Sequence, residues 1–101
     1  MKLNLMERFT IQKILPQESN FATLKVLNAL RMSLAPSEEE TKKYEIENKG
    51  GLILWNEEGK DETEIEIGEK ATDLIIESLK RLDESKKLTN EHFSIYEKFV
   101  K

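Results

Sequence analysis

The chain has 101 residues, of which 38% are hydrophobic and 36% are charged, with a net charge of −4 and no cysteine. This length suits a single domain spanning residues 1–101. The lack of cysteine excludes disulfides and thiolate chemistry, and no apolar run approaches the ~20 residues of a membrane span. A phosphate backbone repels an acidic chain, which disfavours a nucleic-acid partner. We therefore expect a cytoplasmic domain with no membrane role.

Three helices are predicted in the first half of the chain. Asn4 and Glu7 have the spacing of a capping box, and the apolar stripe that follows predicts a helix over 4–15. Leucines at spacings of three and four predict a second helix over 19–34. A second capping box predicts a short, solvated helix over 37–43.

The hydrophobic period then changes to that of strands. Residues 44–48 and 63–67 alternate between apolar and polar side chains, and 52–55 is a continuous apolar run. Gly50 and Gly51 supply a turn between the first two strands. The simplest arrangement is a three-stranded antiparallel meander, with 52–55 in the centre and covered on both faces.

Two more helices are predicted over 69–87 and 90–99, so the fold class is α+β in the order ααα-βββ-αα, with about five helices. The side chains expected in the core are those of Leu27, Leu30, Leu54, Ile65, Ile67, Leu74, Ile75, Leu79, Phe93 and Tyr96.

The densest run of one charge lies between Glu57 and Glu69, with Lys60 as its one base inside the loop. Such a strip could meet a basic partner, or it could be the solvated edge of a strand, where charge prevents edge-to-edge pairing. Trp55 and Tyr44 lie beside it in the predicted sheet and are typical interface anchors. The candidate partner-binding residues are therefore Tyr44, Trp55, Glu57, Glu58, Asp61, Glu62, Glu64 and Glu66.

No residues are assigned to catalysis, to a metal or to another cofactor. His92 is the single histidine, and no nucleophile stands at a diagnostic spacing from it. The acidic stretch does not match the pattern of a calcium loop. Gly50 and Gly51 belong to no phosphate-binding motif.

The chain resembles small accessory proteins encoded in tailed-bacteriophage genomes. The resemblance covers nearly the whole chain and rests on four segments, none of them a catalytic signature. These are Met1–Asn4, Ile14–Pro16 with Asn20–Lys25, Glu64–Ala71 and Tyr96–Phe99. It implies a protein that binds a host macromolecule, blocking a defence system or redirecting host machinery, and it implies no site residues.

The expected function is therefore that of a non-enzymatic phage accessory protein that binds and inhibits or redirects a host macromolecule, with a host protein as its partner. Two alternatives stay open. The order of helices and hairpin also fits a winged-helix DNA-binding regulator, but its recognition helix, 37–43, opens with three glutamates. A nucleotide-binding sponge or small enzyme would need a deep pocket with convergent polar groups. The sequence leaves the oligomeric state open.

Overall fold

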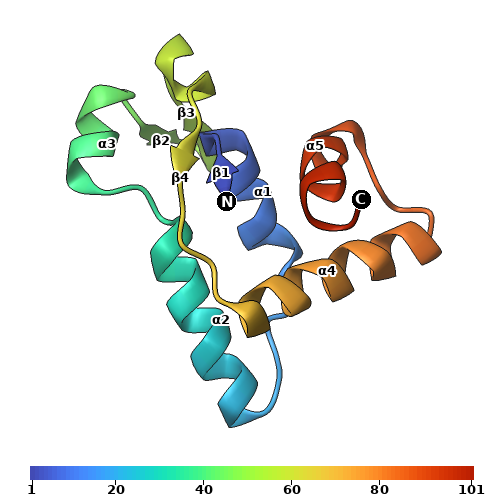
Figure 1. Ribbon diagram of the computed structural model, residues 1–101. Coiled ribbons are helices and arrows are strands. Elements are labelled where there is room, and N and C mark those ends of the chain that lie inside the picture. Colours follow the sequence, from blue (N-terminus) through green and yellow to red (C-terminus); the bar gives the residue numbers. More distant parts are fainter.

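A computed structural model describes all residues from 1 to 101 (Figure 1). In chain order the elements are β1 (Lys2–Leu3), α1 (Leu5–Ile14), α2 (Phe21–Leu34), α3 (Glu38–Lys43), β2 (Glu47–Lys49), β3 (Leu52–Leu54), the 3-10 helix η1 (Glu57–Lys60), β4 (Thr63–Glu64), α4 (Glu69–Glu84) and α5 (Asn90–Phe99). Five α-helices and short antiparallel strands confirm the α+β class.

The helices begin at the capping residues that the sequence indicates. The backbone N–H of Glu7 donates to the Asn4 side chain at 2.9 Å, and that of Asn4 donates to the Glu7 carboxylate at 3.0 Å. Ser37 and Glu40 form the same reciprocal pair at the start of α3. Because these bonds satisfy N–H groups that have no partner inside the helix, they set where α1 and α3 start.

The predicted three-stranded meander is wrong. Four short strands form two separate antiparallel pairs, β1 with β4 and β2 with β3. The strand expected over 44–48 starts only at Glu47, because Tyr44 still belongs to the end of α3. The N–H of Asn56 donates to the carbonyl of Tyr44 at 2.8 Å, which joins the two ends of the hairpin where it leaves α3. Ile65 then donates to the carbonyl of Met1 at 2.8 Å, so this segment pairs with the N-terminus instead of the hairpin.

The core lies where four helices meet. In Figure 1, α1 lies between α2 and α5, and α4 runs below α1 and α5. Each of these four helices contacts at least two of the others. The fully buried side chains of this core include Leu27, Ile75, Leu79 and Ile95.

Most of the expected core residues are confirmed. Leu27, Leu30, Ile65, Ile75 and Leu79 are buried, and Ile67, Leu74 and Tyr96 are partly buried against the same cluster.

Two expected core residues are wrong. Phe93 is 65% exposed, because Ile95 occupies the inward face of α5 instead. Leu54 is exposed because its hairpin has no covering element.

A buried arginine joins three helices. Arg8 of α1 donates to the carbonyls of Leu34 and Ala35, both at 3.0 Å, and to both carboxylate oxygens of Glu40 at 2.7 and 3.1 Å. The carbonyls at the end of α2 lack partners inside that helix, so the guanidinium satisfies them and anchors α3. This contact holds α3 and the hairpin that follows it against the helical body.

Candidate functional site: an apolar hairpin beside an acidic turn

The hairpin of β2 and β3 turns at Gly50 and Gly51. Their φ angles are +58° and +86°, and a type I′ turn requires positive φ at both central positions. Lys49 lies opposite Leu52, Asn48 opposite Ile53, and Glu47 opposite Leu54. The two glycines thus fix a two-residue turn and the register of the strands.

The apolar strand of this hairpin is exposed. Leu52, Ile53 and Leu54 have 68%, 42% and 47% of their surface in contact with solvent. The sequence predicts that this strand is covered on both faces, and that prediction is wrong. Its one strand neighbour is β2, all of whose residues are exposed and polar.

A hollow of about 220 Å³ lies between the hairpin and α1. Met6 and Phe9 of α1 line one side of it, and Ile53 and Trp55 line the other. The rings of Phe9 and Trp55 meet at a centroid distance of 5.5 Å and an angle of 30°. Leu54 does not border this hollow and lines a separate one with Ile46. We define the hairpin surface as the apolar residues Met6, Phe9, Leu52, Ile53 and Trp55 of the hollow together with the exposed Leu54.

The 3-10 helix η1 packs tightly against this surface. Gly59 is buried, and a Cβ atom there would overlap the Trp55 ring. Its backbone therefore lies directly against the indole, a close approach that only glycine permits. The contact holds the charged residues of η1 beside Trp55.

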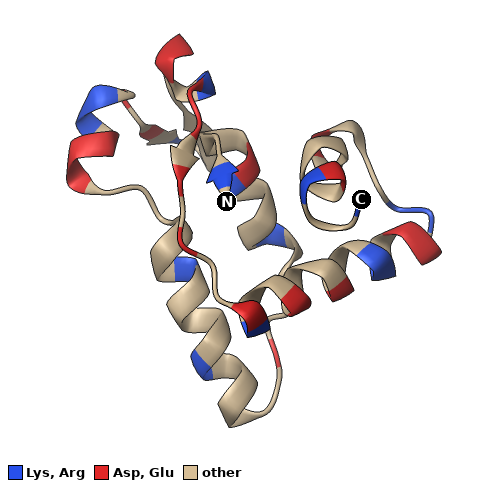
Figure 2. Cartoon of the chain, viewed as in Figure 1, with Lys and Arg blue, Asp and Glu red and all other residues tan.

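Glu57, Glu58 and Asp61 form the acidic turn. All three are exposed, and none takes part in any of the ion pairs of the structure. The Asn56 side chain accepts a hydrogen bond from the N–H of Glu58 at 3.0 Å, which orders the start of the turn. Figure 2 shows this acidic segment on η1, followed by further acids along β4.

The other acids of the predicted strip differ in their contacts. Glu62 pairs with Lys98 of α5, and Lys98 also donates to the buried Glu7 at 2.8 Å. Burial lowers the pKa of Lys98, but its hydrogen bonds to Glu62 and Glu7 outweigh that effect and raise the pKa. Glu64 pairs with the N-terminal ammonium of Met1, whose hydrogen bond lowers the pKa of that carboxyl. The strip thus contains one part that is free of ion pairs and one part, Glu62 and Glu64, that is paired with α5 and the N-terminus.

The remaining candidates lie elsewhere. Tyr44 is buried, so its ring supports the fold and is not on the surface. Trp55 is partly buried and keeps one edge on the hollow beside Ile53. Glu66 is exposed and borders a different hollow, between α2 and the start of α4.

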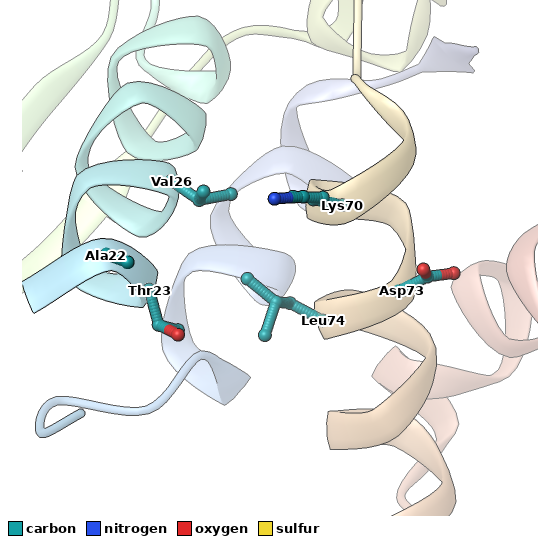
Figure 3. Close-up of a pocket in the computed structure, with 6 residues that line it drawn as sticks. All are labelled: Ala22, Thr23, Val26, Lys70, Asp73 and Leu74. Carbon is teal, nitrogen blue, oxygen red and sulfur yellow. The ribbon is translucent and has the colours of Figure 1, made fainter. Parts of the chain in front are cut away.

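A second hollow, of about 230 Å³, lies between α2 and α4 (Figure 3). Val26 and Thr23 face Lys70 and Leu74 across it, while Asp73 points away on the far side of α4. A ligand site needs several polar groups that converge on one point. Lys70 is the one charged side chain directed into this space in the view of Figure 3, so the hairpin surface is the stronger candidate.

His92 caps its own helix. Its Nδ1 atom accepts a hydrogen bond from the N–H of Thr89 at 2.9 Å, at the start of α5. No three His, Cys, Asp or Glu side chains are grouped so that they could hold a metal ion. None of the helices combines the length and hydropathy needed to cross a membrane.

Comparison with protein-family models, with curated proteins and with solved structures finds no significant match to this chain.

The sequence reasoning missed Met6, Phe9 and the strand 52–54 as site residues. One signal was available. The strand 52–54 carries no polar residue, and its partner strand, Glu47–Lys49, carries no apolar one. The apolar side chains of the hairpin therefore have no apolar neighbours on the partner strand to cover them.

Proposed function

We propose that this chain is a non-enzymatic phage accessory protein that binds a host protein through its hairpin surface and thereby inhibits or redirects it. The observation that carries the proposal is the exposure of Leu52, Ile53 and Leu54 as a contiguous apolar strand. The phage context rests on the resemblance described above.

The exposed strand supports a binding role because its exposure is costly. Burying a leucine or isoleucine side chain stabilises by about 1.5–3 kcal/mol, and three such side chains here leave much of that gain unused. Contiguous apolar surface rimmed by polar groups is typical of protein-binding sites. The partner therefore presents an apolar pocket or ridge that covers these side chains.

The acidic turn supports a partner whose contact surface carries lysine or arginine at its rim. Exposed charges of this kind chiefly speed encounter and fix orientation, while the apolar centre supplies affinity. Glu57 and Glu58 are available for this role because no cation of the chain pairs with them.

DNA binding is the less favoured alternative. A winged helix would read bases with α3 and touch the backbone with the hairpin. The first turn of α3 holds Glu38, Glu39 and Glu40, and the hairpin tip carries one lysine, Lys49, which already contacts Glu47 at 3.5 Å. This arrangement favours a protein partner over a phosphate backbone.

The experiment captures proteins from a bacterial host lysate on immobilised wild-type chain and identifies them by mass spectrometry. A Leu52→Glu, Leu54→Glu variant tests the hairpin surface, and Met32→Glu is the matched control. Met32 is 80% exposed but lies on α2, outside the hairpin surface. We expect one protein to be retained by wild type and by the control and lost by the hairpin variant. Equal retention by all three would contradict the proposal.

The contribution of the acidic turn is then measured as an association rate with the captured protein. Reversing Glu57, Glu58 and Asp61 to lysine should slow association and weaken its dependence on salt, because these charges are exposed and screened by ions. An unchanged rate would leave the apolar strand as the whole of the site.

A further inference from the structure

The hollow between the hairpin and α1 (the hairpin hollow) is walled by three segments that lie far apart in the sequence. Its lining includes Leu52, Ile53 and Trp55 of the hairpin, Met6 and Phe9 of α1, and Glu91 in the first turn of α5. The helix α1 packs against α5 and against η1. The walls are therefore set by the fold and do not have to form when a partner arrives, which lowers the cost of binding.

The size of the hairpin hollow suits one side chain. Its volume is about 220 Å³, whereas pockets for whole small molecules span about 300–1,000 Å³. A nucleotide or a cofactor of similar size is therefore too large for it. Protein interfaces, by contrast, depend on a few large side chains that each fill a pocket on the partner.

The lining of the hairpin hollow favours an apolar guest. Met6, Leu52 and Ile53 are exposed there, and the ring of Trp55 meets that of Phe9. Water against such walls has few hydrogen-bond partners, so an apolar group that displaces it gains affinity. The flexible side chain of Met6 can adjust to the shape of the guest.

Two opposite charges line the hairpin hollow without pairing with each other. Lys13 of α1 and Glu91 of α5 are both exposed. Lys13 takes part in no ion pair, and Glu91 lies near only Nε2 of His92, at 3.9 Å. Because Nδ1 of that ring accepts a hydrogen bond from the N–H of Thr89, the imidazole is neutral and leaves the charge of Glu91 uncompensated.

The surroundings of the hairpin hollow are acidic on balance. Glu91 is joined by the three residues of the acidic turn, which η1 holds beside Trp55. The cations of the same region are Lys13 and Lys60, so four acids stand against two cations. A guest with basic neighbours is therefore favoured, and Lys13 directs those neighbours toward α5 and η1 by repelling them from the end of α1.

We propose that the hairpin hollow receives one large apolar side chain of the host protein, carried on a segment with lysine or arginine beside it. The inference rests on the proposed function and names the chemistry of the residue that anchors the partner. The apolar side chain supplies affinity by filling the hollow. Its basic neighbours are drawn to Glu91 and to the acidic turn, which fixes the orientation of the segment.

Short blocked peptides test the inference without the host protein. The probes are Lys-Lys-Leu-Lys-Lys, the same peptide with serine at its centre, and the leucine peptide with glutamate in place of every lysine. Trp55 is the single tryptophan of the chain, so its emission reports binding at the hollow without a label. We expect saturable binding of the first peptide at millimolar concentration.

The other two peptides should bind about ten-fold more weakly or worse. The serine peptide lacks the apolar anchor, and burying a leucine side chain is worth about ten-fold or more in an equilibrium constant. The glutamate peptide meets like charges at Glu91 and at the acidic turn. Binding of either peptide as tight as that of the first overturns the inference, as does a first peptide that does not bind.

Methyl NMR on the unmodified chain provides a second test that does not depend on how a variant folds. Met6 lines the hairpin hollow, and Met32, exposed on α2, lies outside it. The leucine peptide should shift the methyl signal of Met6 and leave that of Met32 in place. A Met6 signal that shifts with chain concentration alone would put a second copy of the chain in the hollow and would overturn the inference.

Two adjacent substitutions then separate the hollow from the rest of the hairpin, with the captured host protein as the ligand. Ile53 and Leu54 are 42% and 47% exposed, but only Ile53 lines the hairpin hollow. We expect Ile53→Glu to weaken binding of the host protein about ten-fold more than Leu54→Glu does.

The inference and the proposed function fail separately. A host protein that is captured through the hairpin and binds Ile53→Glu as tightly as Leu54→Glu overturns the inference and leaves the proposed function standing. Binding of the leucine peptide at the hollow, with no host protein captured through the hairpin, removes the proposed function and leaves the preference of the hollow for an apolar side chain with basic neighbours.

Discussion

The strand β3 and the helix α4 are built from the same apolar residue types and end in opposite environments. In α4, Ile75 and Leu79 are fully buried, at a spacing of four with Ile76, Glu77 and Ser78 between them. In β3, Leu52, Ile53 and Leu54 are consecutive, and all three are exposed. Residue type alone therefore does not determine burial in this chain.

The difference lies in what each element packs against. The helix α4 contacts α1, α2 and α5, and each of these supplies an apolar face. The strand β3 contacts β2, which has no apolar side chain to offer. The helical body is thus packed without the hairpin, and the apolar strand is left exposed.

The largest effect is expected in the core. Leu79→Ala should lower the free energy of unfolding by about 2–5 kcal/mol, because it loses transfer energy and leaves a cavity among packed helices. Urea unfolding of the variant measures this loss. A loss below about 1 kcal/mol would mean that Leu79 does not lie on the buried face of α4.

A smaller loss in the free energy of unfolding is expected at the ion pair that joins α1 and α5. Glu7 is buried and bonded to Lys98, so Glu7→Gln should cost about 1–3 kcal/mol near neutral pH. Urea unfolding at a series of pH values measures it, with Glu58→Gln as a control that should cost almost nothing.

The same variant should change the response to acid. Burial raises the pKa of Glu7, but bonds from Lys98 and the Asn4 N–H outweigh burial and hold it below 4.5, its ordinary value. The stability supplied by this carboxylate is therefore complete above pH 4.5 and is lost as the pH falls through the lower folded-state pKa. Glu7→Gln should flatten that part of the acid response, and an unchanged profile would contradict the lowered pKa.

A still smaller difference in the free energy of unfolding is expected between substitutions in the two parts of the acidic strip. Glu62→Lys places a like charge beside Lys98 and should cost up to about 1 kcal/mol, since the pair is partly exposed and screened by salt. Glu58→Lys touches no ion pair and should stay within about 0.5 kcal/mol of wild type. Thermal unfolding of both variants compares them, and equal losses would remove the distinction between the free and the paired acids.

Local patterns predicted the helices well. The capping boxes at Asn4 and Ser37 and the leucine periodicity of α2 depend only on nearby residues, so the sequence is enough to place them. The strand pairing depends on contacts between distant segments. No local pattern indicates that Ile65 bonds to Met1, 64 residues away, and this pairing replaces the expected meander.

The candidate site was predictable in part. The charge density of the segment after Trp55 marks the acidic turn directly. Which acids are free depends on Lys98, which reaches Glu62 and Glu7 from the last helix, and sequence spacing does not show this. The exposure of β3 depends on the absence of a third strand, so it follows from the topology and not from the strand itself.

The central claim is that the apolar strand serves recognition and not folding. Urea unfolding of the Leu52→Ser, Leu54→Ser double variant tests it most directly. Exposed positions contribute little to folding, so the account predicts a total loss below about 1 kcal/mol. A loss above about 3 kcal/mol, comparable with that of Leu79→Ala, would show that these leucines belong to the core and would contradict the account.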